Sequence, residues 1–121
     1  MDRALKILIV DDDQMILESL KALLRYKAYE IDTTSSAKEA LRLLNQNIYD
    51  LAILDIMMPE MTGFELLDSL DRGSLDTMFM IMTGDASMDY AIEAIRKMAN
   101  DYIRKPFEPD ELMMRVEMVL K

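Results

Sequence analysis

The stretch KILIVDDDQM, residues 6–15, runs from a short apolar segment straight into three consecutive aspartates, Asp11, Asp12 and Asp13. The apolar part, residues 5–10, has the composition of a buried β-strand, so the aspartates stand where that strand ends. Like charges about 4 Å apart repel by roughly 4 kcal/mol at an effective dielectric constant near 20. A folded chain that gathers carboxylates in this way must gain a compensating interaction, and a bound cation is the candidate.

Short apolar runs alternate with amphipathic stretches along the whole chain. Strands are expected at residues 5–10, 29–34, 51–54, 78–82 and 101–104, and helices at residues 14–26, 36–46, 64–70, 87–98 and 109–120. Strands that are separated by helices in this way indicate an α/β fold, with a parallel sheet covered on both faces. Because the crossovers are right-handed, the carboxyl ends of all strands open on one edge of the sheet, where ligands bind.

The composition restricts the kinds of chemistry that are available. A length of 121 residues fits one compact domain, and a net charge of -9 argues against direct nucleic-acid binding. The chain has no cysteine and no histidine, which excludes disulfides, thiolate zinc sites, a cysteine nucleophile and the usual histidine general base. No segment has the pattern of a signal peptide or the apolar length of a membrane span, so we expect a cytoplasmic protein without membrane contact.

Four of the expected strands end close to side chains that suit phosphoryl transfer. The aspartates 11–13 follow the first strand, Asp55 the third, Thr83 the fourth and Lys105 the fifth. Carboxylates favour a hard divalent cation, most simply Mg²⁺. A carboxylate such as Asp55 is a competent nucleophile toward phosphorus, and Lys105 together with a cation would stabilise the transferred group.

Four motifs stand in this order along the chain: LIVDDDQ, ILDIMMPEMTG, MTG and DYIRKPF. Together they resemble the receiver domain of two-component response regulators, and the resemblance covers residues 1–121 as one domain, with no output domain in this chain. It implies a flavodoxin-like (βα)₅ fold whose five parallel strands take the order 2-1-3-4-5. It also implies a signalling module, which takes part in its own phosphorylation and autodephosphorylation, rather than a turnover enzyme.

Carried over by position, the resemblance assigns a metal site and a phosphoacceptor. Asp11 and Asp12 resemble the acidic pair that binds Mg²⁺, or Mn²⁺ in its place, and Asp55 resembles the phosphoacceptor that shares the metal. Met57 would contribute its backbone carbonyl to the metal.

The resemblance also assigns the residues that respond to phosphorylation. Thr83 resembles the switch hydroxyl, Tyr102 the switch aromatic, and Lys105 the lysine that contacts the phosphate. Met57 and Asp85 are two residues beyond Asp55 and Thr83, and they would tune the lifetime of the phosphate in a direction that the sequence leaves open. The Lys105–Pro106 bond is open to either isomer.

The implied phosphoryl donor is a phosphohistidine on a sensor histidine kinase or a histidine phosphotransfer protein. The surface of the fourth helix, fifth strand and fifth helix would change on phosphorylation and contact an output domain or target protein. The same surface is a candidate homodimer face. Four charged residues of this surface could pair across a dimer: Asp101, Arg104, Glu111 and Arg115. Mixed charges of this kind usually only cover a solvated surface.

Simpler and rival explanations remain at this point. The aspartates 11–13 could only cap the following helix, and we expect Asp13 to do so while Asp11 and Asp12 bind metal. A haloacid-dehalogenase-like phosphatase also uses an Asp-x-Asp pair, although Met15 stands where threonine or valine is expected. A flavodoxin-like FMN carrier fits the architecture alone, and three aspartates would repel its phosphate.

Overall fold

The computed structural model describes residues 4–25, 27–70, 75–84, 93–94, 96 and 99–121. The strands are β1 (Lys6–Val10), β2 (Glu30–Thr34), β3 (Leu51–Asp55), β4 (Met78–Thr83) and β5 (Asp101–Arg104). The helices are α1 (Gln14–Arg25), α2 (Ala37–Gln46), α3 (Gly63–Asp68) and α5 (Pro109–Val119). Most of the expected fourth helix lies outside the described residues. None of the described helices combines the length and the apolar character needed to cross a membrane.

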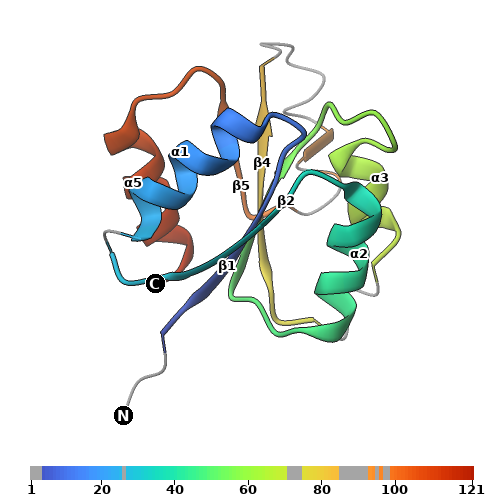
Figure 1. The fold of residues 1–121 in the computed structure, drawn as a ribbon, viewed down its shortest axis with the longest axis horizontal. Coiled ribbons are helices and arrows are strands. Elements are labelled where there is room, and N and C mark those ends of the chain that lie inside the picture. Colours follow the sequence, from blue (N-terminus) through green and yellow to red (C-terminus); the bar gives the residue numbers. More distant parts are fainter. Residues whose placement is uncertain (1–3, 26, 71–74, 85–92, 95, 97–98) are drawn as a thin grey trace.

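The five strands form one parallel sheet in the order β2-β1-β3-β4-β5, as expected. Figure 1 shows α1 and α5 on one face of the sheet and α2 and α3 on the other. Strand β2 lies at one edge, where it carries the acidic side chains of Glu30 and Asp32. The central position of β1, β3 and β4 brings the ends of these strands together.

The central strands are apolar throughout because both of their faces are covered. Alternate side chains enter two separate cores: Leu8 and Leu54 pack toward α2 and α3, whereas Ile9 and Ile53 pack toward α1 and α5. All four are fully buried, and each contributes about 1.5–3 kcal/mol relative to an exposed side chain. Met80 and Met82 of β4 are fully buried in the core on the α1 and α5 side, whereas Met78 at the start of this strand is exposed.

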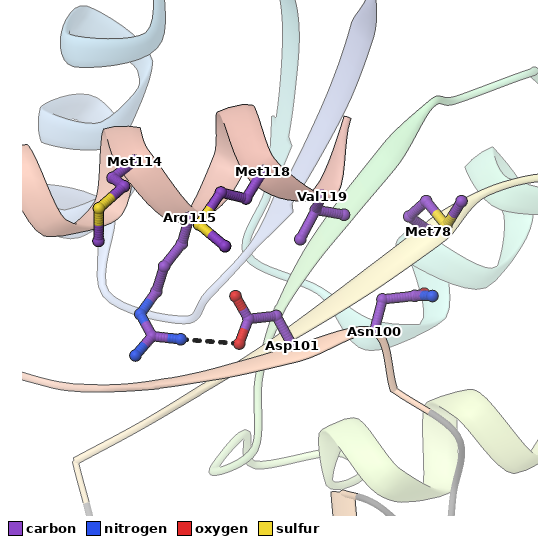
Figure 2. Close-up of a pocket in the computed structure, with 7 residues that line it drawn as sticks. All are labelled: Met78, Asn100, Asp101, Met114, Arg115, Met118 and Val119. Atoms are coloured by element: carbon purple, nitrogen blue, oxygen red, sulfur yellow. Dashed lines mark hydrogen bonds and ion pairs between the residues drawn. The ribbon is translucent and has the colours of Figure 1, made fainter. Parts of the chain in front are cut away.

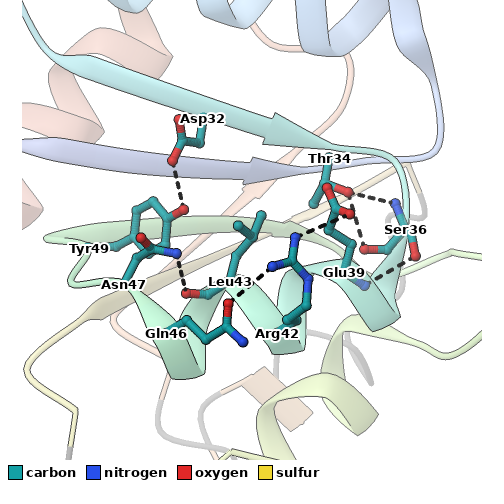
Figure 3. Close-up of polar contacts among 9 residues, drawn as sticks. All are labelled: Asp32, Thr34, Ser36, Glu39, Arg42, Leu43, Gln46, Asn47 and Tyr49. Atoms are coloured by element: carbon teal, nitrogen blue, oxygen red, sulfur yellow. Dashed lines mark hydrogen bonds and ion pairs between the residues drawn. The ribbon is translucent and has the colours of Figure 1, made fainter.

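Helix α2 and the segment that follows it are fixed by side-chain hydrogen bonds (Figure 3). Ser36 caps the helix by accepting the backbone N–H of Glu39 at 3.2 Å. Beyond the helix, the hydroxyl of the buried Tyr49 donates to Asp32 of β2 at 2.7 Å. Burial and this hydrogen bond raise the pKa of Tyr49 above its ordinary value. Tyr49 is therefore neutral at pH 7 and links the segment after α2 to β2.

Two strand ends differ from the sequence-based expectation in a way that concerns function. We expected β3 to end at Leu54 and β4 at Met82, but both strands continue by one residue. Asp55 still pairs with Met82, and Thr83 still pairs with Arg104. The other differences at element ends are one or two residues. Helix α3 begins earlier than expected because Thr62 and Glu65 form a capping box around its first turn.

The turn after α1 contains a backbone strain that predicts a stabilising substitution. Ala28 has a φ of 62°, in the left-handed region that glycine adopts at lower cost. We expect Ala28→Gly to raise the free energy of unfolding by about 0.5–1 kcal/mol in urea denaturation. Ala22→Gly, in the exposed middle of α1, is the control and should lower it by about 1 kcal/mol. Equal destabilisation by both would contradict the strain.

Candidate functional site

The carboxyl edge of the sheet gathers the side chains that the sequence singled out. Asp11 directly follows β1, Asp55 ends β3, Thr83 ends β4 and Lys105 directly follows β5. These four strands are consecutive in the sheet and run parallel, so their ends lie side by side. The expected convergence of distant residues on one edge is confirmed.

Three carboxylates form a compact acidic cluster. Asp11, Asp12 and Asp55 each offer an oxygen, and these three oxygens lie within 4.8 Å of one another. Asp11 is fully buried and Asp55 is 4% exposed, whereas Asp12 is exposed. Oxygen donors at this spacing, open to solvent on one side, suit a hard cation that keeps some of its water ligands.

The ammonium group of Lys105 compensates the cluster from within the protein. Its Nζ lies 2.6 Å from Asp11 Oδ2, across 94 residues of sequence, and 3.5 Å from Asp55 Oδ1. Asp11 is fully buried, so loss of the Lys105 ammonium would leave its carboxylate without a counter-charge and strongly destabilise the fold. The peptide bond between Lys105 and Pro106 is cis.

Asp13 caps α1 instead of joining the cluster. Its Oδ1 accepts the backbone N–H of Met15 at 2.9 Å, at the start of the helix. Its own backbone N–H donates to Asp11 Oδ1 at 2.9 Å, which fixes the orientation of that carboxylate. The expected division of labour among the three consecutive aspartates is therefore confirmed for Asp13.

The loop after β3 wraps closely around Asp55. The backbone N–H of Met57 donates to Asp55 Oδ1 at 3.4 Å, and the Met57 side chain is 56% exposed beside it. At Gly63, which begins α3, a Cβ atom would lie 2.7 Å from the carbonyl oxygen of Asp55. A side chain at position 63 would therefore push this loop away from the phosphoacceptor candidate.

The electrostatic environment raises the pKa of Asp55 to about 6. Burial is the main cause, and the nearby carboxylate of Asp11 adds to it. Lys105 and the N–H of Met57 act in the opposite direction without cancelling the effect. The ionised form of Asp55 is thus disfavoured until more positive charge arrives.

The residues assigned to switching lie at the ends of β4 and β5. Thr83 is fully buried, and its carbonyl oxygen accepts the backbone N–H of Lys105 at 2.6 Å. Tyr102 is partly buried and packs against the core on the α2 and α3 side. Their roles in switching stay predictions, as does the effect of Met57 on phosphate lifetime. Asp85, the other lifetime candidate, lies outside the described residues.

A family model described as the response regulator receiver domain matches residues 7–117. The chain belongs to this receiver domain family. The response regulator SaeR of Staphylococcus aureus is 40% identical over 114 residues, which cover 94% of this chain and 50% of SaeR. The receiver domain thus spans about half the length of the curated relatives it matches.

Solved structures of other receiver domains are similar to this one throughout. A CheY-like receiver domain protein from Methanospirillum hungatei has a TM-score of 0.91 at 33% identity, covering 98% of this chain and 94% of that chain. The response regulator TrrA of Thermotoga maritima, solved in complex with Mg²⁺ and BeF, has a TM-score of 0.85 at 34% identity, covering 96% and 99%. The receiver family is supported over the phosphatase and FMN-carrier alternatives.

Two features of the site were not anticipated from the sequence. One is the direct ion pair between Lys105 and Asp11, since Lys105 was expected only to contact a phosphate. The other is a hydrogen bond from the backbone of Ala37 to Glu60 in the loop after β3. No local sequence pattern pairs a loop carboxylate with the start of a helix 23 residues earlier.

The raised pKa of Asp55 predicts that this domain is less stable when the carboxyl is ionised. Because the pKa in the folded protein is about 6, above the ordinary 3.8, this group's contribution to stability falls as the pH rises through that window. Asp55→Asn should therefore raise the free energy of unfolding without Mg²⁺ by about 1–3 kcal/mol above pH 6.

The pH dependence provides the internal control for this prediction. Near pH 4 the wild-type carboxyl is largely protonated, so wild type and Asp55→Asn should have similar stabilities in urea unfolding with a chelator. The difference should then grow between pH 4 and 6 and level off above that range. A difference that does not vary with pH would contradict the assigned pKa.

Proposed function

We propose that this receiver domain is a phosphorylation-controlled switch that accepts a phosphoryl group on Asp55. The supporting observation is the arrangement of a nearly buried Asp55 carboxylate beside Asp11, Asp12 and the Lys105 ammonium. Membership of the receiver family points to a phosphohistidine on a sensor kinase or phosphotransfer protein as the donor, and the partner would supply the histidine that this chain lacks.

A divalent cation belongs to this proposal. Asp11, Asp12 and Asp55 would hold Mg²⁺, or Mn²⁺, with the backbone carbonyl of Met57 as a further ligand. Three converging carboxylate oxygens fit the oxygen preference of these ions. When bound, the ion neutralises negative charge on the phosphoryl oxygens and on the cluster.

In the transfer step, a carboxylate oxygen of Asp55 attacks phosphorus in line with the bond to the donor histidine. The new P–O bond forms as the P–N bond breaks, and the imidazole nitrogen keeps the electron pair. The loop around Asp55 orients the attacking oxygen through the N–H of Met57. Lys105 stabilises the charge on the phosphoryl group in the transition state.

A groove beside the acidic cluster suits the donor protein. It has a volume of about 590 Å³, and Met15, Leu20, Phe107 and Lys105 are among the residues that line it. Met15 is 77% exposed, so an apolar surface borders the ammonium that would contact the phosphoryl group. We propose that the protein that carries the phosphohistidine docks here.

The acyl phosphate would then change the contacts of Thr83 and Tyr102. The added charge attracts the Thr83 hydroxyl and the Lys105 ammonium. An inward shift of Thr83 gives Tyr102 room to turn toward it, which alters the surface formed by the fourth helix, β5 and α5. A complete switch from 1:99 to 99:1 requires about 5.5 kcal/mol of differential contacts, so we expect partial activation.

The α5 and β5 part of that surface has an apolar hollow (Figure 2). Its volume is about 510 Å³, and Met78, Met114 and Met118 contribute to its lining. Arg115 pairs at 2.8 Å with Asp101 of the same chain, and its Nε lies 3.4 Å from Glu111. We propose this face for an output domain, a target protein or a homodimer, with methionines as the contacts, since Arg115 already has partners within the chain.

The phosphoacceptor is tested by incubating the domain with Mg²⁺ and a small phosphodonor, such as acetyl phosphate, and measuring the mass of the intact protein. Asp55→Asn should abolish the added phosphoryl group because the amide is a poor nucleophile. Asp13→Asn is the matched control, since asparagine caps a helix as well as aspartate does, and it should be modified at the wild-type rate. Normal modification of Asp55→Asn would refute the proposal.

The exposed Met57 predicts an effect on the lifetime of the phosphate. An apolar side chain beside Asp55 obstructs attacking water, whereas an amide would hold water there by hydrogen bonds. We therefore expect Met57→Asn to increase the rate of dephosphorylation, measured after removal of the phosphodonor. Met118 is also exposed but lies on α5, and Met118→Asn should leave the rate unchanged. An unaltered rate in Met57→Asn would discard the shielding role.

A further inference from the structure

The loop between β3 and α3 is bonded to the sheet at its start, and its end is bonded back to its start. At its start, the backbone N–H of Ile56 donates to the carbonyl oxygen of Met82 in β4 at 3.0 Å. At its end, the N–H of Gly63 donates back to the carbonyl oxygen of Ile56 at 3.0 Å. Residues 57–62 therefore form a loop whose flanking residues are joined by a hydrogen bond, and this loop begins close to Asp55.

Glu60 connects the outer part of this loop to a different element. Its Oε1 accepts the backbone N–H of Ala37, the first residue of α2, at 3.0 Å. The N–H groups of a first helical turn have no acceptor within the helix, and a carboxylate there is further favoured by the helix dipole. Ser36 accepts the N–H of Glu39 in the same turn, so Glu60 and Ser36 satisfy different donors.

The start of α2 is itself joined to the other half of the acidic cluster. The hydroxyl oxygen of Thr34 accepts the N–H of Ser36 at 3.1 Å, and the carbonyl oxygen of Thr34 accepts the N–H of Asp11 at 3.2 Å. A continuous path of short contacts thus runs from the loop beside Asp55, through Glu60 and the start of α2, to Asp11. The backbone segments that carry the two buried carboxylates, Asp11 and Asp55, are therefore connected through the start of α2.

We propose that Glu60 is a positioning residue for the cation site. By anchoring the loop to α2, it keeps the Met57 carbonyl at a fixed distance from the carboxylates of Asp11 and Asp55. Mg²⁺ demands nearly ideal octahedral geometry, so its affinity depends on a loop that does not drift. The inference rests on the proposed function, because it concerns the cation of that same site.

The loop also has an apolar anchor, which makes the inference falsifiable. Met58 is 8% exposed and packs into the core on the α2 and α3 side. If this packing alone fixes the loop, Glu60 is dispensable for cation binding. The two anchors act on neighbouring positions, and only Glu60 can be altered without opening a cavity in the core.

The test is calorimetric titration of the unphosphorylated domain with MgCl₂, comparing wild type with Glu60→Ala, Glu60→Gln and Glu39→Ala. Glu60→Ala should weaken Mg²⁺ binding by roughly two- to tenfold, because the loop loses the hydrogen bond that joins it to α2. Glu60→Gln keeps an oxygen acceptor of the same reach without the charge and should stay close to wild type. Glu39→Ala removes a carboxylate from the same helical turn without touching the loop, and should bind as wild type does.

A second measurement needs no metal. Amide hydrogen exchange followed by NMR should show faster exchange at Ala37 and Met57 in Glu60→Ala than in Glu60→Gln.

The outcomes separate this inference from the proposed function. Unchanged affinity in Glu60→Ala would overturn the positioning role, and so would equal weakening by Glu60→Gln or by Glu39→Ala, which would reduce the effect to charge or helix stability. Absence of Mg²⁺ binding in the wild type would instead refute the proposed cation site, and the positioning role with it.

Discussion

Two carboxylates buried at the end of a parallel sheet, with one ammonium between them, set the terms for the rest of this molecule. When both are ionised, the buried carboxylates of Asp11 and Asp55 repel each other, and burial together with this repulsion raises the pKa of Asp55. Lys105 reduces the repulsion but supplies only one positive charge. The apolar strands β1, β3 and β4 provide the stability that tolerates such an arrangement, and a site with unsatisfied charge has a built-in affinity for cations.

The fold and the principal site could be predicted because they follow from short-range patterns and a handedness rule. The apolar run before Asp11 and the apolar run before Asp55 identify two buried strands, and right-handed crossovers then oblige their ends to meet. The predicted ends of β3 and β4 each fell one residue short of the observed ends at Asp55 and Thr83. Neither side chain belongs to the apolar run, but the backbone pairing of the sheet continues through both residues.

Other features depend on distances that no sequence period encodes. The contact between Glu60 and the start of α2 joins residues whose spacing has no helical or strand periodicity. The ion pair of Lys105 with Asp11 joins the ends of β5 and β1 across 94 residues of sequence. Both were hidden for the same reason: side-chain reach is decided by how loops lie over the sheet edge.

The ends of β4 and β5 are mechanically joined next to the cluster. A short hydrogen bond from the N–H of Lys105 to the carbonyl oxygen of Thr83 connects these two residues directly through the backbone. Tyr102 lies on the same strand, three residues before Lys105. The carbonyl oxygen of Tyr102 accepts a hydrogen bond from Arg115 of α5 at 3.3 Å, so β5 links the charged edge of the sheet directly to α5.

The acidic character of β2 limits how copies of this domain could associate. As one of the two edge strands, β2 has one side to which another strand could add, and such edge pairing is a common route to aggregation. Glu30 and Asp32 would meet their own counterparts if two copies met along this strand, and facing carboxylates oppose such pairing. Strand-by-strand growth of the sheet at the β2 edge is thereby discouraged at high concentration.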